Sequence, residues 1–169
     1  MKINIIIDGY NVIGVSHGDM KKQRDGLIEL LISYHKSSMH EITLVFDGWK
    51  DGKGNETRTV TGGVTIIYSG LGERADDVIK RIISNRKKKW AVVSSDRDIK
   101  SSAWKNDCVP IDSELFYDRL MRSIDGAGEQ DVPDEDRWEE DEYEENRTKR
   151  SPGKLSKKEK DIRRVIEKL

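Results

Sequence analysis

Short apolar runs recur along the first two thirds of the chain. They fall at residues 3–8, 42–47, 64–68 and 90–95, with a weaker candidate at 107–111. The runs are rich in β-branched residues and nearly continuously apolar, which is typical of parallel strands buried on both faces. We therefore predict four strands and a weaker fifth.

Helical periodicity fills the stretches between these runs. Apolar residues three or four positions apart predict helices over residues 21–39 and 73–86, and a further helix that starts at Asp112 and Ser113. Strands that alternate with helices indicate an α/β domain with a mostly parallel central sheet. The polar, glycine-rich stretch 48–63 predicts an exposed loop.

The pattern changes after residue 123. Residues 125–146 contain twelve acidic residues and one basic residue, whereas residues 147–169 contain ten Lys or Arg and three acidic residues. We predict a folded domain over 1–123, a disordered acidic linker over 124–146 and a basic C-terminal tail over 147–169. Within the tail, a capping box at Ser156 and an apolar stripe predict a helix. This tail is either a solubilising extension or a segment that contacts nucleic acid or the ribosome.

Composition narrows the class of protein. Hydrophobic residues make up 34% of the 169 residues and charged residues 37%, so part of the chain is expected to lie outside a packed core. The single cysteine, Cys108, excludes an internal disulfide and fits a reducing compartment. The first apolar run is interrupted by Asp8, and no run reaches the roughly 18 apolar residues of a membrane span. We expect a soluble, cytoplasmic protein with no membrane partner; the oligomeric state stays open.

Carboxylates stand where the predicted strands end. Three of the strands are followed by Asp8, Asp47 and Asp96, with Asp98 two residues further on; the helix after the third strand opens with Glu73, Asp76 and Asp77. In a parallel sheet all strand C-termini lie on one edge, so these side chains are expected to gather there. Carboxylates so close together repel one another, and oxygen-only ligands favour Mg²⁺ or Mn²⁺. Asn11 could orient a water or a phosphate at the same edge, or serve the turn.

Each of these carboxylates also has a plainer interpretation. An Asp after a strand is commonly a helix N-cap, and Asp76 and Asp77 complement a helix dipole. The coincidence at three strand ends and one helix start favours a site. No glycine-rich phosphate loop follows the first strand, which argues against a dinucleotide enzyme. Arg74 and Arg97 are well placed to contact a phosphate backbone.

Four motifs carry a family resemblance. "IIIDGYNVIG", "LVFDG", "ERADDVI" and "VVSSDRD", in this order, resemble the NYN domain in its bacterial YacP-like branch, which is similar to PIN-domain nucleases with a three-layer fold. The resemblance covers roughly residues 1–122 and departs after the fourth strand, at "SSAWKNDCVPIDSEL". It implies an acidic site at the positions that match the motifs: Asp8, Asn11, Asp47, Asp76 and Asp96, with Asp77 and Asp98 as further metal ligands.

The residues and the resemblance together predict an activity. We expect a metal-dependent endoribonuclease that uses Mg²⁺ or Mn²⁺ to activate water against the phosphodiester of RNA. The family implies mRNA at the ribosome as a substrate and 5′-phosphate and 3′-hydroxyl products. The alternative is a non-catalytic adaptor that binds RNA or the ribosome and keeps a metal-stabilised acidic edge.

Overall fold

A six-stranded, mostly parallel sheet forms the centre of the molecule in this computed structural model, which describes residues 2–14, 19–48, 54–85, 88–124 and 156–169. The strand order is β3-β4-β2-β1-β5-β6, and only β3 is antiparallel to its neighbour. The strands are β1 (Asn4–Asp8), β2 (Glu41–Phe46), β3 (Thr57–Thr61), β4 (Val64–Tyr68), β5 (Trp90–Val93) and β6 (Val109–Ile111). The helices are α1 (Gly9–Ile13), α2 (Met20–Ser38), α3 (Ala75–Ser84), α4 (Arg97–Lys105), α5 (Ser113–Ile124) and α6 (Lys157–Ile166).

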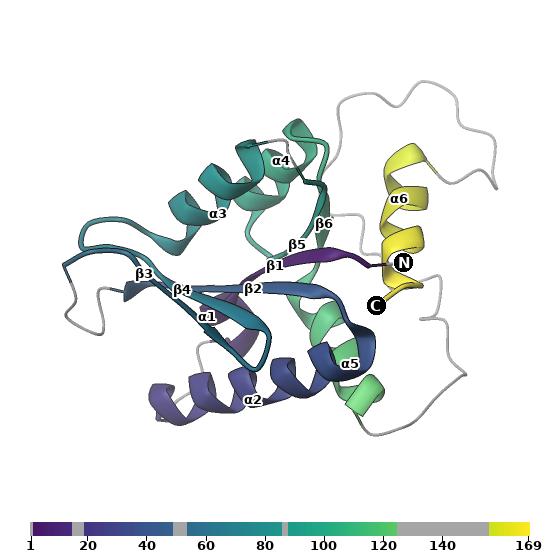
Figure 1. The fold of residues 1–169 in the computed structure, drawn as a ribbon. Helices are drawn as coiled ribbons and strands as arrows, with labels where there is room; N and C mark the ends of the chain where they lie inside the picture. The colour runs from purple at the N-terminus through teal and green to yellow at the C-terminus, as the bar shows by residue number, and fades with distance from the viewer. Residues whose placement is uncertain (1, 15–18, 49–53, 86–87, 125–155) are drawn as a thin grey trace.

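Helices cover both faces of the sheet, which confirms the predicted three-layer α/β fold (Figure 1). Helices α3 and α4 lie on one face, where Ile6, Val45 and Val92 of the central strands point into their core. Helices α1, α2 and α5 lie on the other face and pack on the side chains that alternate with these, such as Ile5, Ile7 and Leu44. Burial on both faces explains why these strands are apolar without alternation.

Two elements differ from the sequence prediction. The stretch 48–63 is not all loop, because β3 occupies residues 57–61 and pairs with β4. This edge strand is exposed along most of its length, so it has no apolar face that a pattern could show. Helix α4 was not predicted at all; only Ile99 and Ala103 of its nine residues are buried.

The basic C-terminal helix α6 packs against the domain. Ser156 caps it in the predicted capping box with Glu159. Its apolar stripe, formed by Ile162, Val165, Ile166 and Leu169, joins the core on the α2 and α5 side of the sheet. The helix therefore belongs to the folded unit. The predicted acidic linker lies outside the described residues, so that domain boundary stays a prediction.

Candidate nuclease site at the sheet edge

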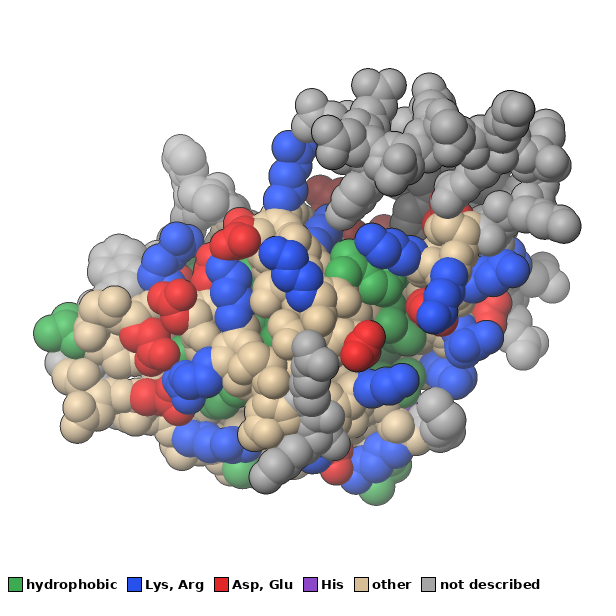
Figure 2. Space-filling model, turned by 90° about the horizontal axis from the view of Figure 1, so that it is seen from above, with side chains coloured by type: hydrophobic (Ala, Val, Ile, Leu, Met, Phe, Trp, Pro, Cys, Tyr) green, Lys and Arg blue, Asp and Glu red, His purple; other side chains and the backbone are tan. Residues whose placement is uncertain are grey.

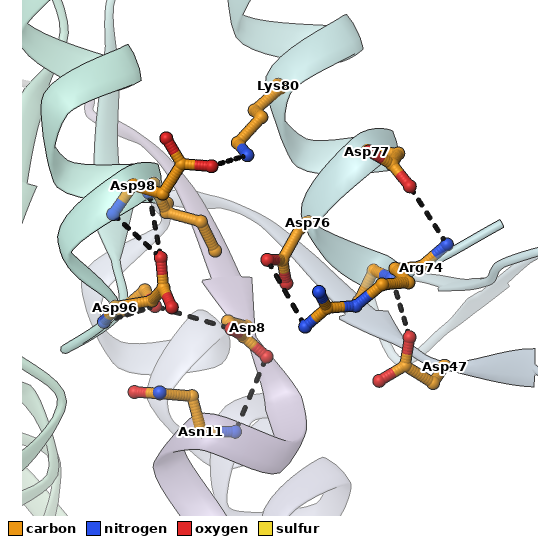
Figure 3. A network of polar contacts seen from close by, with 12 residues as sticks. Asp8, Asn11, Asp47, Arg74, Asp76, Asp77, Lys80, Asp96 and Asp98 are labelled. Carbon is orange, nitrogen blue, oxygen red and sulfur yellow. Dashed lines mark hydrogen bonds and ion pairs between the residues drawn. The ribbon is translucent and has the colours of Figure 1, made fainter.

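Four carboxylates meet at the edge of the sheet where the parallel strands end. Strands β4, β2, β1 and β5 are neighbours and run in the same direction, so their C-termini lie side by side. Asp8 ends β1, Asp47 follows β2, Asp96 follows β5, and Asp76 lies in the first turn of α3 after β4. We call these four residues the carboxylate edge; Figure 3 shows Asp8 between Asp96 and Asp76.

Asp8 is the most buried member of the carboxylate edge. It is only 7% exposed, and loss of hydration raises its pKa from 3.8 to about 6. Its oxygens accept hydrogen bonds from the Asn11 backbone N–H at 3.4 Å and from the Ser94 hydroxyl at 3.3 Å, which oppose the rise. The negative charges of Asp76 and Asp47 raise the pKa further. The Asn11 N–H and the Ser94 hydroxyl thus hold the Asp8 carboxylate in place beside the negative charges of Asp76 and Asp47.

Ser94 links the Asp8 carboxylate to the backbone of Asp96 and was not singled out from the sequence. Its side chain is fully buried. The hydroxyl donates to Oδ2 of Asp8 and accepts from the backbone N–H of Asp96 at 3.1 Å. One serine therefore fixes the end of β1 relative to the start of α4. The only sequence signal is a polar residue directly after an apolar strand.

Asp76 faces Asp8 from the start of α3. Its side chain is 17% exposed, and burial raises its pKa, as do the charges of Asp96 and Asp47, whereas Arg74 opposes the rise. The guanidinium of Arg74 lies 3.6 Å from the Asp76 carboxylate and is 74% exposed. Arg74 is therefore a partial counter-ion that remains accessible from solvent.

Asp47 and Asp96 each cap a helix and also lie in the carboxylate edge, so both interpretations of an Asp after a strand apply to them. Asp47 accepts a hydrogen bond from the Ala75 backbone N–H at 2.7 Å, so it caps α3 from across the sheet edge. Asp96 caps α4 by accepting from the backbone N–H groups of Asp98 at 2.8 Å and Ile99 at 3.0 Å. In both residues Oδ1 makes the cap. Capping fixes each side chain at the edge, so the structural role also positions a charge for the site.

Asp77 and Asp98 lie near the carboxylate edge, but their contacts are elsewhere. The carboxylate of Asp77 accepts from the Arg74 backbone N–H at 3.2 Å, on the far side of the turn from Asp8 (Figure 3). Asp98 is exposed and forms an ion pair with Lys80, which lowers the pKa of Asp98. The structure thus brings four of the six predicted aspartates together and places these two outside the group.

The side chain of Asn11 serves the scaffold of the site. Its Oδ1 accepts a hydrogen bond from the Ser95 backbone N–H at 2.8 Å and another from the Ser113 hydroxyl. It therefore ties α1 to the β5–α4 connection and to α5, which favours the structural alternative for this residue. Arg97, the other predicted phosphate contact, is the exposed first residue of α4 at the same edge.

Two glycines allow the strand ends to approach this closely. A Cβ on Gly9 would collide with the ring of Phe46, and a Cβ on Gly48 would collide with the carbonyl oxygen of Ser69. The Gly48 N–H also donates to the Ser69 hydroxyl at 3.0 Å, which joins the ends of β2 and β4. The glycines after Asp8 and Asp47 in the sequence are therefore required by packing behind the site.

The donor set fits a hard divalent cation. Asp8, Asp76 and Asp96 offer only oxygen, and burial, followed by neighbouring negative charges, raises the pKa of both Asp8 and Asp76. Among the residues that the structure describes, no three His, Cys, Asp or Glu side chains lie close enough to form a metal-binding group. The arrangement therefore suits an ion that keeps several waters and takes one or two carboxylates, as Mg²⁺ does.

A parallel α/β sheet flanked by helices, with aspartates gathered at the strand C-termini, is the architecture of a PIN-like nuclease domain. The sequence profile of the YacP-like NYN domain matches residues 5–167, so the chain belongs to this PIN-like nuclease family. The match includes α6, beyond the extent that the motifs indicated.

Solved structures agree on the fold. A crystal structure of Rae1 (YacP) from Bacillus subtilis has a TM-score of 0.59 and 20% sequence identity, over 75% of this chain and 77% of that chain. A crystal structure of a point mutant of the same protein gives a TM-score of 0.57 and 19% identity, over 73% and 76%. At this identity the likeness shows the fold alone. No curated protein matches the chain significantly. None of the described helices is long and apolar enough to cross a membrane.

Proposed function

We propose that the protein is a metal-dependent endoribonuclease and that the carboxylate edge is its active site. One observation carries the proposal: Asp8 is buried at the centre of a group of like charges, and its pKa is raised to about 6. A fold gains no stability from such an arrangement, because burial and repulsion both penalise the ionised form. Perturbed carboxylates of this kind are typical of catalytic sites.

Some residues of the site would bind the metal ion, and others keep those residues in position. One or two of Asp8, Asp76 and Asp96 would bind Mg²⁺ or Mn²⁺ directly, with waters as its other ligands, and Asp47 would shape the site from the cap of α3. When bound, the metal ion supplies a Lewis acid that neutralises a phosphate oxygen and lowers the pKa of a bound water. Ser94 and the Asn11 N–H keep Asp8 in a fixed orientation, and above its pKa of about 6 Asp8 is ionised.

Arg74 and Arg97 are suited to position the RNA. The Arg74 guanidinium is already drawn toward the site by Asp76 and is mostly exposed, so a phosphate can exchange for part of its hydration. Arg97 lies at the first turn of α4, next to Asp96. By family resemblance, the substrate is expected to be mRNA, with the ribosome as the place of cleavage, and the products are expected to carry 5′-phosphate and 3′-hydroxyl ends.

A cleavage assay tests this proposal. End-labelled RNA is incubated with the wild type, with Asp8→Asn and with Asp98→Asn, in Mg²⁺, in Mn²⁺ and in a chelator. We expect cleavage by the wild type and by Asp98→Asn only with metal, and none by Asp8→Asn. Asp98 is the matched control because it is an aspartate of the same region that pairs with Lys80.

Two results would contradict the nuclease. RNA binding without metal-dependent cleavage by the wild type would favour the adaptor. Equal cleavage by the wild type and Asp8→Asn would place the active site elsewhere or reveal a contaminating nuclease. Binding is measured on the same preparations, so the two activities are separated directly.

A further inference from the structure

Helix α6 is fixed to the edge of the sheet opposite the carboxylate edge. The Tyr34 hydroxyl donates to the Leu169 carbonyl at 2.7 Å, and Nε2 of His40 lies 2.8 Å from the Lys168 carbonyl. His40 is 5% exposed, and its Nδ1 accepts from the Ile3 backbone N–H at 3.4 Å, just before β1. Tyr34 and His40 precede β2, so these contacts lie where the strands begin. Figure 1 shows α6 beside the N-terminus, at the far end of β1 from α1.

The packing of α6 decides which of its side chains face solvent. Ile166 is 6% exposed, and Ile162, Val165 and Leu169 pack against the same core. The lysines and arginines of the helix therefore point outward, and all of them are exposed. Because the helix is docked along its apolar stripe, the backbone positions that carry these charges are fixed relative to the domain.

Other basic residues extend this surface. Lys2 and Lys88, which precede β1 and β5, are 58% and 50% exposed in their side chains and share the carboxylate of Glu41. We call this surface the basic pole and define it by six residues: Lys2, Lys88, Lys157, Lys160, Arg163 and Arg164. Figure 2 shows several Lys and Arg side chains over α6, with acidic side chains among them, and further acidic side chains at the opposite side of the view. A hollow of about 360 Å³ beside the pole is lined by Lys2, Ser38, Met39, His40 and Lys168.

We propose that the basic pole is a second RNA-binding surface, which holds the phosphate backbone of a folded RNA while the carboxylate edge reaches a separate strand. This inference rests on the proposed function, because it concerns the RNA that the nuclease acts on. The surface is charged, exposed and spread over several elements. These are the properties of backbone recognition, in which lysines and arginines neutralise successive phosphates.

The distance between the two surfaces specifies the size of the partner. Strand β1 has five residues, and a strand rises about 3.3 Å per residue, so its first and last Cα atoms are about 13 Å apart. Helix α6, with a diameter of about 10 Å including side chains, adds to that separation. An oligonucleotide shorter than this separation cannot reach the basic pole from the active site, whereas a large folded RNA is long enough to contact both surfaces.

Two charge variants of opposite sign on α6 test the proposal. Lys157→Gln/Lys160→Gln/Arg164→Gln removes three positive charges from the outer face. Asp161→Asn/Glu167→Gln is the matched control on the same helix. It removes the acidic partners of Arg164 at 3.7 Å and of Arg163 at 3.2 Å. Binding to a folded RNA and to a short single-stranded oligonucleotide is measured in a salt series by fluorescence anisotropy, in chelator so that no cleavage occurs.

We expect the triple variant to bind the folded RNA more weakly. The slope of log K against log salt should flatten by about 0.7–0.9 for each phosphate that the variant no longer neutralises. The double variant should bind more tightly, and both should bind and, in metal, cleave the short oligonucleotide like the wild type. Equal affinities and salt slopes of the wild type and triple variant for the folded RNA would overturn the proposal, as would weaker binding by both variants.

The same measurements separate this inference from the nuclease. Charge-dependent binding of folded RNA by a protein that cleaves nothing would refute the proposed function and leave the basic pole as an RNA-binding surface. Intact cleavage together with binding of folded RNA that does not change with the charge of α6 would refute the role of the basic pole and leave the proposed nuclease standing.

Discussion

The two ends of the sheet place carboxylates in opposite surroundings, and the pKa values of Asp8 and Glu41 shift in opposite directions. Asp8, at the end of β1, is 7% exposed, and burial raises its pKa to about 6. Glu41, at the start of β2, is 43% exposed in its side chain and lies 2.7 Å from Lys88 and 3.5 Å from Lys2. The Lys88 hydrogen bond is the main cause of the lowered pKa of Glu41. Lysine partners in solvent stabilise the charged form of Glu41, whereas burial among like charges destabilises the charged form of Asp8.

Under the two proposals, catalysis and RNA recognition lie at opposite ends of the same sheet. Folding concentrates unfavourable charge at the carboxylate edge, where backbone N–H groups and Ser94 hold the side chains in place. It distributes favourable, solvated charge over the basic pole. In the proposed nuclease, the first surface is a preorganised site for metal and phosphate. The second surface offers many weak, salt-dependent contacts.

Asp76 and Asp77 provide the largest expected contrast, because they are neighbours with different surroundings. Asp76 faces Asp8, whereas Asp77 bonds the Arg74 backbone. We expect Asp76→Asn to lower kcat for RNA cleavage by about 10- to 100-fold, as loss of a group that supports a metal site does. Asp77→Asn should keep the activity, because an amide can still accept the Arg74 N–H. Single-turnover rates at saturating metal measure this, and equal losses in both variants would remove Asp76 from the site.

The difference in unfolding free energy between the wild type and Asp8→Asn should measure how much the buried charge of Asp8 destabilises the fold. The folded protein retains a proton at Asp8 between pH 3.8 and about 6, whereas the unfolded chain has already released it. The wild-type unfolding free energy should therefore fall as the pH rises through this window, by about 2–3 kcal/mol in total, and then stay level. In metal-free buffer, Asp8→Asn should lack this fall, so it should match the wild type near pH 4 and exceed it at neutral pH.

Denaturant titrations over the pH range measure this difference. Asp98→Asn is the control, because Asp98 is ionised and paired with Lys80 and should not show the same gain at neutral pH. A variant at Asp8 that is less stable than the wild type at neutral pH would mean that the carboxylate is structural.

Metal affinity should depend on the same proton. A cation at the carboxylate edge needs Asp8 ionised, so below pH 6 the apparent affinity for Mg²⁺ should fall by about tenfold for each pH unit. The apparent affinity is measured from the shift of the melting temperature in Mg²⁺ titrations at pH values above and below 6. Asp8→Asn should show a smaller shift with a weaker dependence on pH. The same pH dependence in both proteins would place the ion elsewhere, for example among the acidic residues 125–146.

The sequence predicts the buried parts of this fold well and the exposed parts poorly. Strands β1, β2, β4 and β5 follow from continuous apolar runs, because both faces of the sheet are covered. Strand β3 reads Thr-Arg-Thr-Val-Thr and is exposed, so its pairing with β4 is set by the neighbouring strand and not by a hydrophobic face. The pattern likewise showed the apolar stripe of α6, but only the structure shows what the stripe packs against.

The site was predictable to the level of the sheet edge and not beyond it. Strand order and direction place Asp8, Asp47 and Asp96 together whatever their rotamers. Side-chain direction is decided by individual hydrogen bonds, such as the one from the Ala75 N–H to Asp47, which joins residues far apart in sequence. The separation of Asp76 from Asp77 has the same origin, since one turn of helix points adjacent residues in different directions.

The smallest expected effect concerns the attachment of the basic pole. Burial raises the pKa of Tyr34 to about 12, so its hydroxyl remains a donor to the Leu169 carbonyl at any ordinary pH. Tyr34→Phe keeps the ring against Phe116 and removes this hydrogen bond, at a cost of about 1 kcal/mol. Tyr117→Phe on α5, where the side chain is exposed, is the matched control. We expect faster amide exchange in α6 of Tyr34→Phe only, with unchanged cleavage of a short oligonucleotide.

Weaker binding of folded RNA should accompany that exchange, because a loosened helix no longer fixes its lysines and arginines against the domain. Faster amide exchange in α6 with fully retained binding of folded RNA would show that the charges of α6 bind RNA even when the helix is not packed on the domain. The two ends of the sheet would then differ in which charged residues they carry, and the fixed position of α6 would not matter.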